Sequence, residues 1–188
     1  MSIVASPPST PVTAAPPWTT TQWFNSDPLD LTALRGRVVV LEAFQMLCPG
    51  CVAHGLPQIA RLSQTFGDEL AVIGLHSVFE HHEAMTPPSL KAFLYEYRIG
   101  FPVGVDAHQG DNPTPVTFGR YRMRGTPSTV LIDREGNLRG HQFGVVDDMT
   151  LAAAVTRLLD ADGRETASRP VSAASAPTSA CPVDGECA

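Results

Sequence analysis

The sequence predicts an α/β fold, a three-layer α/β/α sandwich with a mixed central sheet and an extra strand on its N-terminal side. Apolar residues run almost without interruption through 38–44 and 70–75, which is typical of strands buried on both faces of a sheet that helices cover. Segments with helical spacing of apolar residues alternate with these strands, which favours a mostly parallel sheet. A late hairpin around the turn at 135–137 adds antiparallel strands at one edge.

Composition divides the chain of 188 residues into three parts. Residues 1–17 are rich in Pro, Ser, Thr and Ala, and we expect a disordered leader there. Residues 18–162 carry the hydrophobic patterns of a single domain. Residues 163–188 return to Ala, Ser and Pro and predict a flexible tail, which carries Cys181 and Cys187.

Net charge and hydrophobic patterning exclude some classes of function. The net charge of −6 argues against nucleic acid or an anionic membrane surface as a partner. No apolar run approaches the ~18 residues that a transmembrane helix needs. The N-terminus has no basic segment followed by an apolar run, so it does not resemble a secretory signal. We therefore expect a cytoplasmic protein, or a periplasmic one if a signal has been removed.

The first half of the domain is predicted as strand, strand, helix and strand. Thr and aromatic residues over 18–24 favour an edge strand. After the strand at 38–44, a helix runs to residue 66, with Pro49 at its first position and Gly67 as its C-terminal cap. Pro57 falls inside this helix and should kink it, because proline removes a backbone hydrogen bond.

The second half continues the alternation. The loop at 76–88 is longer than usual, as functional or mobile loops often are, and we expect its His81, His82 and Glu83 to be solvated. Asp147 or Asp148 should cap the last helix. The remaining predicted elements are helices at 89–98, 117–121 and 151–159 and strands at 101–105, 129–133 and 138–143.

Cys48 and Cys51 stand where a buried strand passes into a helix. At a helix N-terminus, unpaired backbone N–H groups and the helix dipole favour the thiolate form of Cys48, which makes it the candidate nucleophile. Cys51, one turn later, can attack a mixed disulfide on Cys48 and release the product. The alternatives are a structural pair or half of a zinc site, but zinc needs two further ligands and no second Cys-x-x-Cys occurs.

The residues between the cysteines should tune the redox potential. Pro49 comes first, which leaves the N–H groups of Gly50 and Cys51 free to hydrogen-bond the Cys48 thiolate. We expect a more oxidising couple than a Gly-Pro spacing would produce. Exchanging Pro49 and Gly50 should then lower the potential, and an unchanged potential would refute this hypothesis.

Glu42 lies in the middle of an apolar strand, six residues before Cys48. A lone buried carboxylate is costly unless it is paired or protonated, and burial should raise its pKa. Glu42 is therefore a candidate proton acceptor for Cys51. The alternatives are that it turns to solvent or pairs with an arginine.

Three segments together resemble the TlpA/redoxin branch of the thioredoxin superfamily. They are LTALRGRVVVLEAFQMLCPGC at 31–51, VIGL at 72–75 and RMRGTPSTVLIDREG at 122–136, and the resemblance extends over residues 18–160. It implies thiol–disulfide exchange at Cys48 and Cys51, an acid at the position of Glu42, and no dissociable cofactor. It also implies a cis Thr126–Pro127 bond in a loop that faces the cysteines and binds extended substrate.

The chain departs from that family pattern in three respects. Leu47 precedes the first cysteine, where the family usually has Trp. Pro57 falls six residues after Cys51 rather than five, which bears on the geometry of the helix. Family members are usually exported or membrane-anchored, and no signal is visible here.

The predicted partners are protein disulfides or dithiols, or a small thiol, together with an upstream reductase or oxidant. A thiol peroxidase is one alternative, but Gln45 and Leu41 occupy positions where peroxiredoxins have Thr or Ser and Pro. A metal-binding or copper-delivery module using Cys48, Cys51 and a histidine is the other. Copper-delivery relatives usually separate the two cysteines by three residues, whereas two separate them here.

Cys181 and Cys187 are an unusual pair for this resemblance. Pro182 and Gly185 lie between them, so the two thiols can close on each other. A tethered dithiol reaches the main site at roughly millimolar effective concentration. The pair is therefore a candidate relay to Cys48 and Cys51, with an inert tail or weak metal capture as the alternatives.

Overall fold

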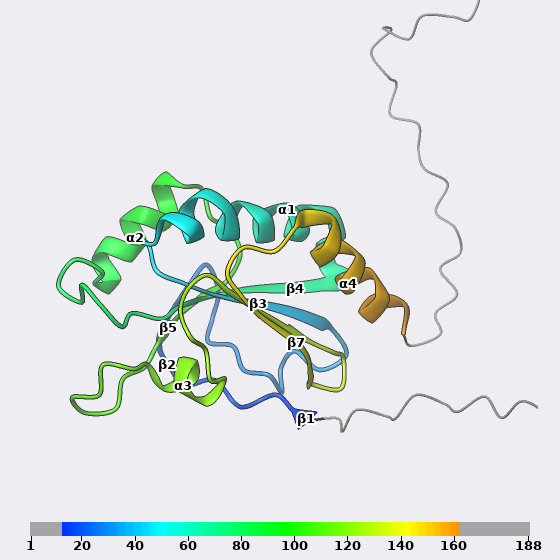
Figure 1. Cartoon of the computed structure of the whole chain (residues 1–188), viewed down its shortest axis with the longest axis horizontal. Coiled ribbons are helices and arrows are strands. Elements are labelled where there is room, and N and C mark those ends of the chain that lie inside the picture. The colour runs from blue at the N-terminus through cyan, green and yellow to red at the C-terminus, as the bar shows by residue number, and fades with distance from the viewer. Residues whose placement is uncertain (1–12, 162–188) are drawn as a thin grey trace, which may run out of the picture.

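The computed structural model describes residues 13–161, which form one mixed sheet with helices on both faces (Figure 1). The strand order is β1-β7-β6-β3-β4-β5-β2. The strands are β1 Thr13–Ala14, β2 Thr20–Phe24, β3 Val38–Phe44, β4 Leu70–His76, β5 Val103–Asp106, β6 Ser128–Ile132 and β7 Asn137–Phe143. The α-helices are α1 Leu56–Phe66, α2 Pro87–Glu96, α3 Val116–Arg120 and α4 Asp148–Asp160.

The predicted three-layer α/β class is confirmed, but the sheet is less parallel than expected. Within residues 13–161 only β3–β4 and β4–β5 pair in parallel, and the other four pairings are antiparallel. The late hairpin lies on one side of the sheet as predicted, with β6 antiparallel beside β3 and only the short β1 outside β7, and the edge strands β1 and β2 add two further antiparallel pairings.

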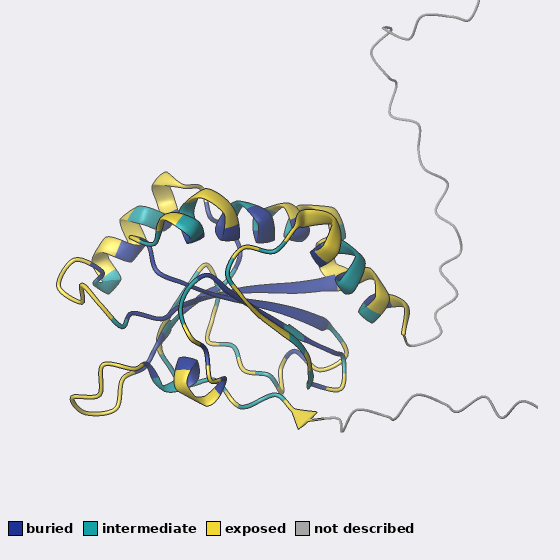
Figure 2. Cartoon of the chain, viewed as in Figure 1, coloured by how far each residue is buried: buried dark blue, intermediate teal, exposed yellow. Residues whose placement is uncertain are grey.

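β3 is the central strand, and all seven of its residues are buried (Figure 2). Helices α1, α2 and α4 cover one face of the sheet, whereas α3 and the segment before β3 cover the other (Figure 1). Alternate β3 residues therefore enter two separate cores. The first core takes Val38, Val40 and Phe44 with the three longer helices, and the second takes Val39, Leu41 and Ala43 with Phe118 and Tyr121.

The N-terminal boundary of the fold lies earlier than the sequence predicted. Thr13 pairs with Leu138 in β7, and the Ala15 N–H donates to the Gly136 carbonyl at 2.9 Å. The Tyr121 hydroxyl donates to the Pro16 carbonyl at 2.7 Å. The expected leader is therefore wrong for residues 13–17, because backbone pairing recruits a segment whose composition carries no hydrophobic signal. Residues 1–12 and the tail from 162 lie outside the described residues.

The helix after the cysteines begins with a π-helical turn, Cys51–Gly55. The Leu56 N–H donates to the Cys51 carbonyl, five residues back, where an α-helix would use four. A π turn accommodates one additional residue, and Pro57 follows it at the start of α1, where it needs no N–H partner. The π turn thus adds one residue between Cys51 and Pro57, which accounts for a spacing of six residues where the family pattern has five. Gly67 caps α1 as predicted, with φ of 54°.

Candidate active site

Cys48 lies just beyond the C-terminal end of β3 and is half-buried. Its N–H donates to the Gln45 carbonyl at 3.1 Å, which closes the turn between strand and helix. The Cys51 N–H donates to Cys48 Sγ at 3.4 Å, and Sγ donates to the Thr126 carbonyl, also at 3.4 Å. A helix N–H directed at the sulfur is the contact that would stabilise a thiolate there.

Cys51 is fully buried, in contrast to Cys48. Both cysteines are free thiols in this structure. Burial raises the pKa of Cys51 to about 12, and the hydrogen bond with Cys48 adds to the rise. Cys51 therefore remains protonated near neutral pH, and it needs a base before it can act as a nucleophile.

Glu42 is buried in β3, with its two carboxylate oxygens in different surroundings. Thr129 Oγ1, on the paired position of β6, donates to Oε2 at 2.7 Å. Oε1 is buried and has no hydrogen-bond partner among residues 13–161. Burial raises the pKa of Glu42 to about 7, and the Thr129 hydrogen bond partly opposes the rise. A solvent-facing Glu42 is ruled out because the residue is 1% exposed, and no ion pair among residues 13–161 joins it to an arginine.

The helix bearing Cys51 approaches Glu42 closely at Gly55. A Cβ on Gly55 would lie 2.5 Å from Glu42 Oε1 and 3.2 Å from Pro127 Cβ. Cys51 and Gly55 are four residues apart, so they share one side of the helical turn. The free oxygen of Glu42 therefore faces the side of the helix from which Cys51 projects.

The Thr126–Pro127 peptide bond is cis, as the resemblance implied. A Cβ on Gly50 would lie 3.3 Å from Pro127 Cδ, so this loop lies directly against the cysteine turn. The fold thus brings together Cys48, Pro49, Gly50, Cys51, Glu42, Thr126 and Pro127, the residues predicted as the site. Cys181 and Cys187 lie outside the described residues.

A groove of ≈ 390 Å³ opens beside Cys48. One side comes from the cysteine turn and the Thr126 loop, and the other from the loop between β4 and α2. Its lining residues are Leu47, Cys48, Pro49, Phe79, Glu80, His81, Ala84, Gly125 and Thr126. The sequence indicated this loop by its length, and His81 is exposed as expected and also lines the groove.

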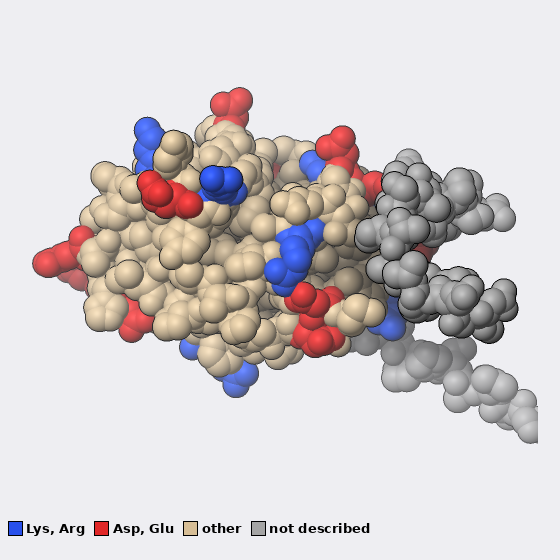
Figure 3. Space-filling view, turned by 90° about the horizontal axis from the view of Figure 1, so that it is seen from above, with Lys and Arg blue, Asp and Glu red and all other residues tan. Residues whose placement is uncertain are grey.

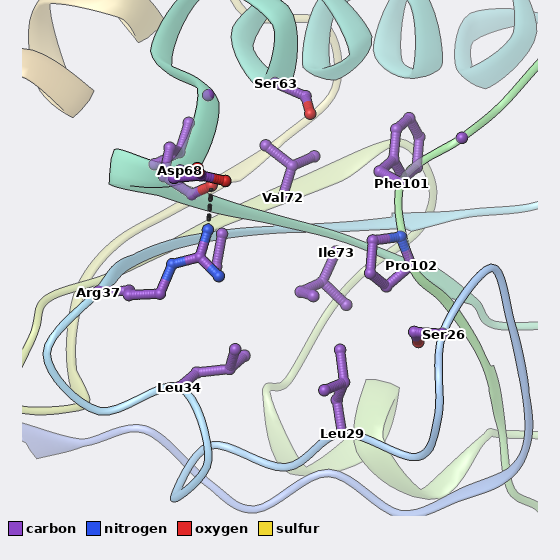
Figure 4. A pocket seen from close by; sticks show the side chains of 14 residues that line it. Ser26, Leu29, Leu34, Arg37, Ser63, Asp68, Val72, Ile73, Phe101 and Pro102 are labelled. Atoms are coloured by element: carbon purple, nitrogen blue, oxygen red, sulfur yellow. Dashed lines mark hydrogen bonds between the residues drawn. The ribbon is translucent and has the colours of Figure 1, made fainter.

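A second pocket, of ≈ 480 Å³, lies at the opposite ends of the parallel strands (Figure 4). Leu29, Leu34 and Ile73 supply apolar walls, and Arg37 donates from Nη2 to the Leu70 carbonyl at 3.0 Å. No cysteine lines this pocket among the residues described, whereas Cys48 lines the groove. The groove is therefore the better candidate for thiol chemistry.

Two site residues were not predicted, Thr129 and Gln45. Thr129 is recognisable only from the register of β6 on β3, which pairs positions 87 residues apart. Gln45 is 1% exposed, and its side chain joins the turn before Cys48 to the loop after β4. A polar residue directly after a buried strand was the available signal.

Within 13–161, no three His, Cys, Asp or Glu side chains are grouped so that they could hold a metal ion. In the same range, no helix is long and apolar enough to cross a membrane.

On the face formed by α1, α2 and α4, acidic and basic side chains are interspersed over a largely uncharged surface (Figure 3).

Comparison with known proteins agrees with this geometry. Residues 12–141 match the model of the AhpC/TSA family. A solved thioredoxin-like superfamily protein is 57% identical, with a TM-score of 0.76 over 79% of this chain and 97% of that one. A thiol-disulfide isomerase from Corynebacterium glutamicum is 48% identical, with a TM-score of 0.75 over 78% and 97% of the two chains.

Protein DipZ of Mycobacterium tuberculosis is 30% identical over 144 residues, which is 74% of this chain. The chain spans only 20% of the length of that curated relative. The similarity therefore concerns one part of a longer protein.

Proposed function

The chain belongs to the AhpC/TSA family, and on that premise we propose that it is a thiol–disulfide oxidoreductase, with Cys48 and Cys51 as the exchanging pair. The observation that carries the proposal is the difference in burial between the two cysteines. Cys48 is half-buried and its sulfur accepts the Cys51 N–H at 3.4 Å, whereas Cys51 is fully buried. The similarity to a thiol-disulfide isomerase over nearly all of that protein supports the same class of activity.

In the reducing direction, the Cys48 thiolate attacks one sulfur of a substrate disulfide. The substrate S–S bond breaks, one substrate thiolate leaves, and a mixed disulfide joins Cys48 to the other sulfur. Cys51 then attacks Cys48 Sγ and releases the second substrate thiolate. The substrate gains two electrons and the protein ends as the Cys48–Cys51 disulfide, and the reverse sequence oxidises a dithiol.

The second step needs a proton acceptor, because the pKa of Cys51 is raised to about 12. Glu42 has the free oxygen Oε1 on the side of the helix that carries Cys51, and its pKa is about 7. A carboxylate with that pKa is partly deprotonated near neutral pH and can take up and return a proton. We assign Glu42 this role.

The substrate is held beside Cys48 by the Thr126–Pro127 loop and by Pro49 and Gly50. The Thr126 carbonyl is already within 3.4 Å of Cys48 Sγ, so a peptide carrying the reactive disulfide would lie along this loop. Protein disulfides or a small thiol are the proposed substrates. The direction of exchange depends on the potential of the pair against that of its compartment, which is reducing in the cytoplasm and oxidising in the periplasm.

A redox titration against glutathione, with each disulfide mapped by mass spectrometry, tests the proposal. We expect a reversible Cys48–Cys51 disulfide with one defined potential, and accumulation of a mixed disulfide in Cys51→Ser but not in Cys48→Ser. Cysteines that stay unpaired throughout the titration would refute the exchange. Rapid consumption of peroxide by Cys48 alone, with no Cys48–Cys51 disulfide, would favour the peroxidase alternative.

A further inference from the structure

The loop between β4 and α2 is attached to the cysteine turn through one buried side chain, Gln45. Its Oε1 accepts the Phe79 N–H at 3.3 Å, and its Nε2 donates to Glu80 Oε1 at 3.2 Å. Its own carbonyl accepts the Cys48 N–H at 3.1 Å. Glu80 is thereby held at a defined place relative to the reactive sulfur.

Further contacts hold the same loop against the fold. The Phe79 ring packs on Phe118, with 5.3 Å between centroids, and Met85 is buried. The N–H groups of Ala84 and Met85 both donate to the His81 carbonyl. These contacts fix the loop in place as one side of the groove. The length of the loop had also been consistent with a mobile segment.

The groove combines apolar surface with one negative charge. Leu47, Pro49, Phe79 and Ala84 supply the apolar part, and Leu47 is 55% exposed. Glu80 is exposed, and no Lys or Arg nitrogen of residues 13–161 lies within ion-pair distance of it. Its one hydrogen bond comes from a neutral amide, so its charge remains available to a ligand.

The other charged and titratable groups nearby do not cancel that charge. Arg124 is adjacent to the groove residue Gly125, but its guanidinium lies over the Phe143 ring, 5.3 Å from the centroid. Glu83 is exposed on the same loop and does not line the groove. His81 also lines the groove, and no ion pair joins it to Glu80 among the described residues.

We propose that this groove selects substrates with a Lys or Arg flanking the reactive cysteine, and that Glu80 is the residue that determines this specificity. The aliphatic stem of such a side chain packs against Leu47 and Phe79, and its cationic end meets the Glu80 carboxylate. The inference rests on the proposed thiol–disulfide exchange. A partly solvated ion pair predicts a preference of roughly two- to fivefold in kcat/KM, weakened by salt.

The test uses the reduced full-length chain and three matched disulfide peptides with Arg, Gln or Glu beside the cysteine. We expect the order Arg, Gln, Glu for wild type at low salt, and near-equal rates at 0.5 M salt, where the screening length is roughly 4 Å. Glu80→Gln should abolish the order, whereas the matched control Glu83→Gln should keep it.

Equal rates for the three peptides with wild type would overturn the specificity while leaving the exchange reaction intact. An order that persists in Glu80→Gln would also overturn it, because the charge selected would then come from elsewhere. Failure of wild type to reduce even the neutral peptide would overturn both proposals.

Discussion

Glu42 combines a held oxygen with a free one. Oε2 accepts the Thr129 hydroxyl at 2.7 Å, while Oε1 is buried without a partner among the described residues and faces the helix at Gly55. This asymmetry suits a group that must keep its position while it gains and loses a proton. In the proposed mechanism, Thr129 is a positioning residue, which acts on the reaction through Glu42.

Replacing Thr129 by Val should shift the pH dependence of the second step. The Thr129 hydrogen bond lowers the pKa of Glu42, so its loss raises that pKa above about 7. The pH at which Cys51 resolution is half-maximal should move upward by roughly 1 unit, as measured by stopped-flow decay of a mixed disulfide. Thr129→Ser keeps the hydroxyl and should resemble wild type. A Val variant with the wild-type profile would contradict the assignment.

Glu42→Gln should stabilise the protein at alkaline pH. Burial raises the pKa of Glu42 from 4.5 to about 7, so in that window the folded state keeps a proton that the unfolded chain has released. The contribution of Glu42 to stability is therefore present below pH 4.5 and is lost as pH rises through 7.

Urea unfolding of Glu42→Gln and wild type between pH 4 and 8.5 measures this effect. The stability difference should be small at the acid end and should favour the variant by up to about 3 kcal/mol at the alkaline end. Glu96→Gln, at an exposed position on α2, should show no such trend. A difference independent of pH would show that Glu42 has no raised pKa.

At the scale of elements, the π turn and Pro57 form one unit. The extra residue of the turn lets Gly55 approach Glu42 and the cis-proline loop, while Pro57 lies at the second residue of α1, where its missing N–H costs little. The turn therefore sets how the cysteine-bearing end of the helix meets β3.

Gly55→Ala should destabilise the fold, because the added Cβ would lie 2.5 Å from Glu42 Oε1 and 3.2 Å from Pro127 Cβ. We expect a loss of roughly 1–3 kcal/mol in thermal or urea unfolding, together with slower resolution by Cys51. Gly119→Ala is the matched control, since its Cβ would meet Thr114 at an ordinary 3.5 Å. Equal stability of the two variants would refute the close approach.

At the scale of the whole molecule, the site lies where two adjacent parallel strands end. The cysteine turn follows β3 and the groove loop follows β4, and the two strands pair in parallel. Their following segments consequently meet at the same edge of the sheet, where open α/β folds commonly bind ligands. Gln45 joins these two segments.

Our relay hypothesis is that the tail cysteines, Cys181 and Cys187, exchange disulfides with Cys48 and Cys51. If the tail dithiol exchanges with Cys48 and Cys51, a chain that lacks residues 165–188 should turn over severalfold more slowly with a thiol reductant. The double variant Cys181→Ser and Cys187→Ser should reproduce the loss at full length. Unchanged turnover in both would rule the relay out.

Local patterns were sufficient to predict the α/β class, most element positions, the cysteine pair at the end of a buried strand and Glu42 as a buried carboxylate, and the family resemblance added the cis Thr126–Pro127 bond. Apolar runs, helical spacing and short motifs are properties of neighbouring residues, and the resemblance rests on three such segments. The position of Pro57 also signalled an irregular helix, although it did not show that the irregularity is a π turn.

Only the folded chain showed what each of these residues contacts. The Thr129 hydrogen bond depends on strand register between residues far apart, and the Gly55 approach depends on how a helix packs on a sheet. Residues 13–15 join the sheet through backbone hydrogen bonds, which composition does not encode. The groove and its Glu80 wall likewise arise because two loops meet at one edge, a consequence of chain topology rather than of either loop's sequence.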